Sequence, residues 1–178
     1  MFREIPVLPV VVPAAAAVFL ILLWHLHRRD RLSAPRAAVA LTVCVYAAGV
    51  VANTVFPVFL DMPARSAPWD ASLSLTPLAG YEVSDAVMNV LVFVPLGVLV
   101  PLLLTTSSWW RVLAVAAGFS LLIEASQLVT AQLLGGGHVA DVNDLMFNVL
   151  GGVLGLGVLA LVLRLPGASA LVDRFRWR

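Results

Sequence analysis

A glutamate stands in the middle of an apolar stretch that is long enough to cross a membrane. Glu124 lies within the run of residues 112–134. An ionisable side chain at membrane depth costs at least ~2.5–3.5 kcal/mol on insertion scales, so it normally has a partner and a function. Ser120, Glu124 and Gln127 are spaced i, i+4, i+7, which places them on one face of a helix. This spacing predicts a polar stripe that faces away from lipid.

A second polar stripe follows a glycine-rich turn at residues 135–137. Asp141, Asp144 and Asn148 are spaced i, i+3, i+7, so they also share one face of a helix. Two consecutive helices joined by a short turn run antiparallel, and their polar stripes can face each other. We therefore predict that the two stripes form one ligand-binding site between these helices.

The residue types of this site would support acid–base and cation chemistry. Glu124 could act as a general acid or base. Asp141 and Asp144 could hold a divalent cation such as Mg²⁺, because hard cations prefer oxygen ligands. A divalent cation is thus the one cofactor that these residues suggest. Against an enzyme, the sequence shows no activated Ser or Cys nucleophile, no His-x-x-Glu pair and no phosphate-cradling loop.

Each of these residues also has a simpler explanation. Glu124 could serve only as a link between helices, with a hydrogen bond to Asn148 or Asn89; such bonds in membranes average about 0.6 kcal/mol. Asp141 and Asp144 could serve only as helix caps, because acidic side chains in the first turn favour the helix dipole. Both alternatives stay open from the sequence alone.

The composition predicts an integral membrane protein that forms a single domain over residues 1–178. Of the 178 residues, 61% are hydrophobic and 12% are charged, and the mean hydropathy is +1.00. Soluble domains carry about 25% charged residues, roughly twice as many. The net charge of +1 gives no indication of a nucleic-acid partner. Cys44 is the single cysteine, which excludes a disulfide framework.

Five apolar runs predict an all-α, polytopic membrane helix bundle. They cover residues 7–26, 37–60, 85–104, 112–134 and 142–163. The first run is not a signal peptide, because its basic cluster follows the apolar part and does not precede it. Between the second and third runs, we expect residues 74–78 to form an extended or re-entrant piece at the membrane surface, since Pro77 breaks a helix. Trp69 and Tyr81 suit an interfacial position.

The third run adds a further polar residue and a proline. Asn89 lies six residues before Pro95. Proline in a helix removes one backbone hydrogen bond and frees the carbonyl of Leu91. In a membrane a freed carbonyl must be satisfied by protein or water. We therefore predict a kinked helix that presents Asn89 and this carbonyl to a polar cavity.

The placement of arginines predicts the orientation. Three loops or tails on one side carry Arg28, Arg29, Arg31, Arg36, Arg111, Arg164, Arg174, Arg176 and Arg178, and the other side carries Arg3 and Arg65. By the positive-inside rule, the N-terminus lies outside and the C-terminus lies in the cytoplasm.

This orientation places the polar site in the outer half of the membrane. Glu124 lies ten residues before Leu134, or ~15 Å along a helix. Asn148 lies seven residues after Asp141, or ~10 Å along the next helix. We expect Glu124, Gln127, Asn148 and Asn89 to meet there, with the aspartates at the mouth.

Three motifs in this region resemble the VanZ-like family. They are NVLVFVPLG at residues 89–97, IEASQ at 123–127 and DVNDLMFNVLG at 141–151. Their order and spacing match the family over residues 72–157. A fourth stretch, Leu-Thr-Pro-Leu at residues 75–78, resembles the Asn-Leu-x-Pro-Phe element of the family, with Ser74 in place of Asn.

One position departs from the family pattern. The family has Gly-Arg shortly before the aspartates, and here the pair is Gly137-His138. An Arg could hold a phosphate or carboxylate through two parallel hydrogen bonds. His138 can attract an anion only when it is protonated, although we keep it among the predicted ligand-binding residues.

The resemblance implies a multi-pass protein of the bacterial inner (plasma) membrane. The founding member of the family is associated with lowered sensitivity to teicoplanin. We therefore expect an outward-facing pocket that binds or alters a lipid-linked cell-envelope component, with membrane lipids or such a cell-wall component as partners. The alternative is an enzyme that acts on an envelope lipid. Transport is disfavoured, because the five runs show no internal repeat, and the oligomeric state is left open.

Overall fold

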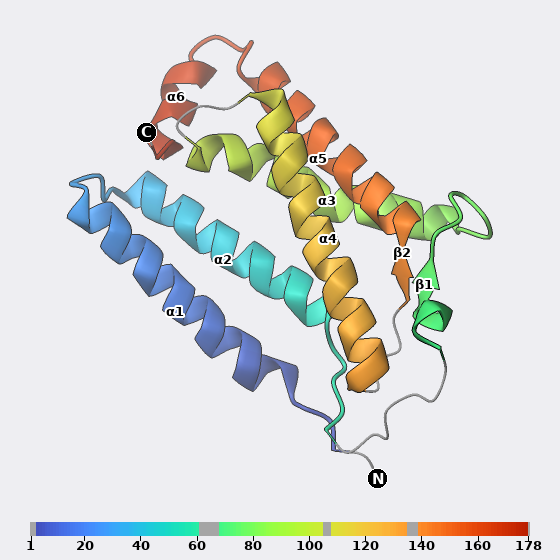
Figure 1. Cartoon of the computed structure of the whole chain (residues 1–178). Helices are drawn as coiled ribbons and strands as arrows, with labels where there is room; N and C mark the ends of the chain where they lie inside the picture. Colours follow the sequence, from blue (N-terminus) through green and yellow to red (C-terminus); the bar gives the residue numbers. More distant parts are fainter. Residues whose placement is uncertain (1–2, 61–67, 105–107, 135–138, 178) are drawn as a thin grey trace.

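The computed structural model describes residues 3–60, 68–104, 108–134 and 139–177. Its five long helices are α1 (Val7–Arg28), α2 (Ala34–Thr54), α3 (Val83–Leu103), α4 (Trp109–Leu133) and α5 (Val142–Val162) (Figure 1). The short elements are a 3₁₀ turn, η1 (Trp69–Ser72), two strands, β1 (Leu73–Ser74) and β2 (Ala140–Asp141), and a final helix, α6 (Ala168–Phe175). The predicted all-α helix bundle is confirmed.

All five long helices are long and apolar enough to cross a membrane. Their apolar side chains point mostly outward, and α1 is the extreme case. Leu8, Leu20 and Ile21 are each at least 60% exposed. In water such a surface would be costly, whereas lipid tails cover it at no cost. The chain is therefore a multi-pass membrane protein.

The predicted second run, 37–60, was too long. Helix α2 ends at Thr54, shortly before Pro57, which cannot continue a helix. Residues 55–60 are not helical, and their backbone pairs with distant segments. Ile5 N donates to Val58 O at 2.9 Å, and Phe59 N donates to Leu134 O at 3.0 Å. These bonds connect the N-terminus, the end of α2 and the end of α4.

Helices α3 and α5 pack in very close contact, because glycines remove the side chains between them. A Cβ atom on Gly97 of α3 would collide with the carbonyl oxygen of Gly152 on α5. A Cβ atom on Gly155 of α5 would collide with the carbonyl oxygen of Val94 on α3. Helix α3 continues through Pro95 as far as Leu103. One face of α3 is thereby committed to α5.

The buried core connects three of the long helices around one aromatic side chain. Phe93 of α3 is 1% exposed and clusters with Val50 of α2 and Ala116 of α4. The Phe93 and Phe119 rings lie 5.8 Å apart between centroids. Aromatic pairs at this separation add to the packing energy beyond their buried area.

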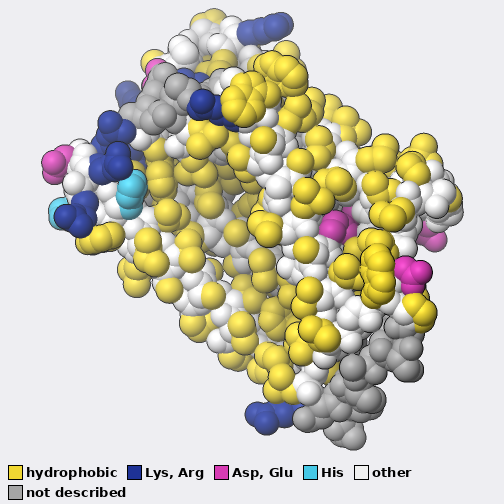
Figure 2. Space-filling model, viewed as in Figure 1, with side chains coloured by type: hydrophobic (Ala, Val, Ile, Leu, Met, Phe, Trp, Pro, Cys, Tyr) yellow, Lys and Arg dark blue, Asp and Glu magenta, His cyan; other side chains and the backbone are white. Residues whose placement is uncertain are grey.

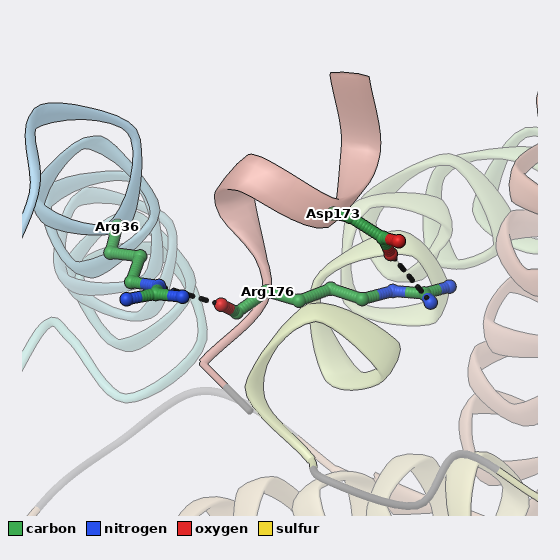
Figure 3. A network of polar contacts seen from close by, with 3 residues as sticks. All are labelled: Arg36, Asp173 and Arg176. Atoms are coloured by element: carbon green, nitrogen blue, oxygen red, sulfur yellow. Dashed lines mark hydrogen bonds and ion pairs between the residues drawn. The ribbon is translucent and has the colours of Figure 1, made fainter. Parts of the chain in front are cut away.

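The C-terminal tail fastens one end of the bundle (Figure 3). Arg36 Nε at the start of α2 donates to Arg176 O at 2.8 Å, and Arg176 forms an ion pair with Asp173 at 3.0 Å. Trp177 N donates to Leu102 O of α3 at 2.9 Å. These contacts bring α2, α3 and the tail together. Helix α6, to which Asp173 belongs, was not predicted from the sequence.

The structure gathers the predicted basic groups at this same end. The α1–α2 turn, the start of α4 and the tail after α5 all lie there, and Figure 2 shows most of the Arg side chains along that border of the molecule. Arg28 and Arg111 lie over the rings of Trp24 and Trp110, at 5.0 Å and 5.3 Å from the centroids. The assignment of this end to the cytoplasm remains a prediction of the positive-inside rule.

Candidate functional site

The opposite end of the bundle is organised by the two short strands. They pair in parallel, with Leu73 beside Ala140 and Ser74 beside Asp141. This pairing attaches the segment between α2 and α3 to the beginning of α5. Residues 74–78, expected to be extended or re-entrant, continue β1 into a turn in which Leu78 has a φ of 61°. Leu78 N then donates to Asn143 Oδ1 at 2.7 Å.

Glu124 is buried at the boundary between α4 and β2. Its side chain is 9% exposed, and Oε2 accepts a hydrogen bond from Asp141 N at 2.8 Å. This partner differs from both of the expected ones, Asn148 and Asn89. The reason is the helix end: the first N–H groups of a helix and its cap have no partner within the helix and need an acceptor.

A cluster of three residues, Tyr81, Asn89 and Asp144, connects α3 to α5. Tyr81 Oη donates to Asp144 Oδ1 at 2.5 Å, and Asn89 Nδ2 donates to the same oxygen at 2.8 Å. Asn89 Nδ2 also lies 2.7 Å from Tyr81 Oη. The Tyr81 ring stacks on Phe147, with centroids 5.4 Å apart and planes 7° from parallel.

The environment of Tyr81 keeps its hydroxyl group protonated. Burial raises the pKa of the Tyr81 phenol well above its ordinary value, and the adjacent Asp144 adds to this shift. Tyr81 therefore acts as the hydrogen-bond donor in this cluster at neutral pH. The sequence predicted only an interfacial anchor at this position, so its role as a partner of Asp144 was missed. Its one signal was a loop tyrosine close to the polar residue of the next helix.

Asp141 caps helix α5. Its Oδ1 accepts from both the backbone N and the side-chain Nδ2 of Asn143, each at 2.8 Å. The capping alternative is thus what the geometry shows for Asp141, and Asp144 lies in the first turn of the same helix. Asn143, which is fully buried, was missed because it falls off the predicted stripe.

The predicted cation site gains no support from these contacts. Asp141 Oδ1 and Asp144 Oδ1 each accept two hydrogen bonds from the protein. Within the described ranges, no three His, Cys, Asp or Glu side chains group closely enough to hold a metal ion. His138 lies outside the described residues. A divalent cation at Asp141 and Asp144 therefore stays a prediction.

Two buried side-chain oxygens on α4 and α5 lack a hydrogen-bond donor among the described residues. Asn148 Nδ2 donates to Ser120 Oγ at 2.9 Å, but Asn148 Oδ1 has no partner among the described residues. Gln127 Oε1 likewise has none, although the Gln127 and Asn148 residues are only 6% and 3% exposed. An unsatisfied buried acceptor is costly. Each oxygen therefore calls for a donor from water or from a ligand.

The four residues expected to meet are divided among separate contacts. Asn89 bonds to Asp144, Asn148 bonds to Ser120, and Glu124 bonds to the Asp141 backbone. No hydrogen bond joins any two of Glu124, Gln127, Asn148 and Asn89 in the described part of the chain. The physical reason is the glycine contact between α3 and α5, which directs Asn89 toward α5 and not toward α4.

A cavity of about 140 Å³ lies between α4, α5 and the paired strands. Its lining consists of Leu73, Leu75, Leu121, Glu124, Ala140, Asp141, Val142 and Leu145. The expected polar cavity lined by Asn89 and the Leu91 carbonyl is not found here, because no residue of α3 is in this lining. The cavity is instead an apolar space, which Glu124 and Asp141 line without exposing a polar atom to it.

The sequence of the chain matches the VanZ/LLP1 family over residues 10–163. The protein belongs to the VanZ/LLP1 family. The match includes the predicted motif region, 72–157, and extends it to most of α1 and all of α2. Comparison with curated proteins and with solved structures found no match.

In this VanZ/LLP1 family member, the third motif connects the other two. Asn89 of the first motif bonds to Asp144, and Glu124 of the second bonds to the Asp141 backbone. Both aspartates belong to the motif at residues 141–151. Helix α6 and the tail that follows it lie beyond the family match. The motifs therefore meet at the beginning of α5.

Proposed function

We propose that this protein binds or alters a lipid-linked component of the bacterial cell envelope at the Glu124 site, and thereby lowers sensitivity to glycopeptides and lipoglycopeptides. The observation that carries this proposal is the position of Glu124. It is a buried carboxyl group in the wall of an apolar cavity, on a helix that is long enough to span a membrane. Membership of the VanZ/LLP1 family supports the link to teicoplanin.

The site suits an amphiphilic ligand. The apolar wall can accept hydrocarbon, while the Glu124 and Asp141 carboxyl groups beside the cavity can accept hydrogen bonds from a polar group outside it. Gln127 Oε1 and Asn148 Oδ1, which lie outside the lining of the cavity, are two further acceptors that no described residue satisfies. A ligand with both a chain and hydrogen-bond donors would use both features.

The location follows from the same proposal. In a bacterial plasma membrane, the basic end of the bundle would face the cytoplasm. The N-terminus would lie outside, and the Glu124 site would lie in the outer half of the bilayer. Lipid-linked cell-wall components and the lipid tails of antibiotics are both accessible from that side.

The enzymatic alternative has less support. It requires Glu124 to transfer a proton and Asp141 and Asp144 to hold a divalent cation. One oxygen of each aspartate is already engaged by two protein donors, and Glu124 Oε2 accepts from the backbone. These contacts are those of a binding site with a fixed framework.

Two antibiotics that differ in a lipid tail provide the test. The chain is expressed in a sensitive bacterium, and the minimal inhibitory concentration is measured for teicoplanin and for a glycopeptide without a tail. The proposal predicts a severalfold rise for teicoplanin and a smaller rise or none for the other drug. Equal protection against both, or no protection at comparable membrane levels, would contradict it.

A further inference from the structure

The cavity beside Glu124 has a wall of hydrocarbon at the depth of lipid tails. Six of its eight lining residues are apolar, and the two others are Glu124 and Asp141. Leu121 lies twelve residues from each end of α4, or ~18 Å from either end at the helical rise. Its side chain is 54% exposed. This part of the cavity therefore faces the hydrocarbon core of a bilayer and not water.

Glu124 and Asp141 lie toward one end of the cavity and line it with apolar atoms only. Leu121 and Leu145 are three and four residues deeper along their helices than Glu124 and Asp141, about one helical turn. At the shallow end, Leu75 is 67% exposed and follows directly after β1. The cavity is thus apolar from its deep end, at Leu121 and Leu145, to the level of Glu124 and Asp141. A lipid chain that fills it would bring its head group toward these two residues.

We propose that the cavity holds a single hydrocarbon chain of a membrane lipid, which enters sideways from the bilayer between α4 and residues 73–75. The head group of this lipid carries an amine or hydroxyl donor that reaches Glu124 or Asp141. This inference rests on the proposed function and names the class of ligand for the same site. It also fixes the route, since the ligand never has to cross water.

The size of the cavity restricts the occupant to one chain. Its volume of about 140 Å³ equals the liquid volume of about five water molecules. That is room for a short section of one chain and not for two chains side by side. Water is a poor occupant, because apolar cavities without polar partners stay dry.

The donor requirement follows from Glu124. Its Oε2 accepts from Asp141 N, while Oε1 has no hydrogen-bond partner among the described residues. A carboxylate oxygen at membrane depth needs a donor. An amine or hydroxyl group on a lipid head supplies one, whereas a quaternary ammonium group does not.

The outer wall of the cavity is held in place by polar contacts. Gln132 Nε2 on α4 lies 3.3 Å from Ser72 Oγ, and the β1–β2 pairing follows immediately. Asn143 and Asp144 hold the Leu78 backbone and Tyr81 against α5. The cavity is therefore formed before a ligand arrives, which reduces the entropic cost of binding.

Photochemical labelling from within the bilayer tests this inference. The full chain is reconstituted in vesicles of phosphatidylethanolamine and phosphatidylglycerol. A trace of phosphatidylethanolamine with a diazirine near the end of one acyl chain is added, and the adducts are mapped after irradiation. We expect adducts concentrated at the lining positions Leu73, Leu75, Leu121 and Leu145. The same diazirine-bearing acyl chain on phosphatidylcholine, whose head group has no hydrogen-bond donor, should label these positions severalfold less.

Cavity-filling variants provide the matched controls. Leu145→Phe should fill the space and lower the adducts at the lining positions by about tenfold. Met146→Phe changes the next residue, which is 46% exposed to lipid and outside the lining, and should leave them unchanged. If Leu145→Phe does not fold, Leu121→Phe and its neighbour Leu122→Phe form a second pair.

The results separate this inference from the proposed function. Adducts spread evenly over lipid-facing positions, and unchanged by the filling variants, would overturn the chain site. Equal labelling by the two head groups would overturn the donor requirement. Specific labelling without any effect on antibiotic tolerance would keep the chain site and reject the proposed function. Antibiotic tolerance without specific labelling would keep the proposed function and reject the chain site.

Discussion

The Tyr81 hydroxyl group should stabilise the fold measurably, because it bridges Asn89 and Asp144. Tyr81→Phe removes the donor to Asp144 Oδ1 at 2.5 Å and keeps the ring stacked on Phe147. A hydrogen bond to a charged group is worth about 1.5–3 kcal/mol. Asn89 still donates to Asp144 in the variant, so the expected loss of unfolding free energy lies near the lower value. For a chain of this size, that is a fall in Tm of about 3–6 °C.

The pH dependence of this loss identifies its cause. The folded pKa of Tyr81 is raised above the unfolded value by burial and by Asp144. A group with a raised pKa contributes its full stability below its unfolded pKa, about 10 for tyrosine, and loses it as the pH rises further. The Tm difference between the wild type and Tyr81→Phe should thus be constant from pH 7 to about 9 and shrink above about 10.

Thermal unfolding in detergent, followed at several pH values, provides the assay. Tyr81→Leu serves as a second variant, since it also removes the ring contact, worth about 0.5–1.5 kcal/mol more. Equal Tm values for the wild type and Tyr81→Phe at pH 7 would refute the reasoning. A difference that does not change between pH 8 and 11 would show that the phenol proton is not involved.

Two further predictions concern packing and orientation. Gly155→Ala should destabilise the fold by about 1–3 kcal/mol or more, because its Cβ collides with the α3 backbone; Gly157→Ala, which meets open space, should be near neutral in the same melts. In a Cys44→Ala background, an impermeant thiol reagent on intact cells should label a cysteine at Ala71 and spare one at Ser33. The reverse labelling pattern would overturn the orientation and the outward-facing site.

The polar stripe on α4 was predictable because it depends on a single helix. Ser120, Glu124 and Gln127 share one face by spacing alone, and all three are buried. Lipid excludes polar side chains, so a stripe of them in an apolar run must face protein. The five membrane helices were predictable for a related reason, since length and hydropathy are local properties of the sequence.

The partners of these side chains were not predictable, because they depend on how helices pair. Because Gly155 has no Cβ, the α3 backbone at Val94 can approach α5 closely. This approach brings Asn89 of α3 to Asp144 of α5. Tyr81 meets Asp144, and Asn143 meets the Leu78 backbone, only because the loop before α3 docks onto α5. Such contacts between distant segments leave no periodic signal in the sequence.

The terminal elements show the same limit. Helix α6 has eight residues, too few for a periodic pattern to distinguish it from a polar tail. Its role becomes visible only in the bonds of the tail that follows it, where Arg176 O accepts from Arg36. The apolar run continues to Leu60 although helix α2 stops at Thr54, where Asn53, Thr54 and Pro57 interrupt the run.

The Glu124→Gln variant tests the central claim most directly. Gln keeps an acceptor oxygen for Asp141 N and nearly the same shape, but it carries no charge and cannot transfer a proton. Teicoplanin tolerance and membrane levels are measured for the wild type, for Glu124→Gln and for Ser126→Ala, a half-buried position on the same helix that lies outside the cavity lining. The account predicts loss of tolerance in Glu124→Gln alone, with normal levels of all three proteins. Full tolerance in Glu124→Gln would contradict it and would leave Glu124 as a structural link between α4 and β2.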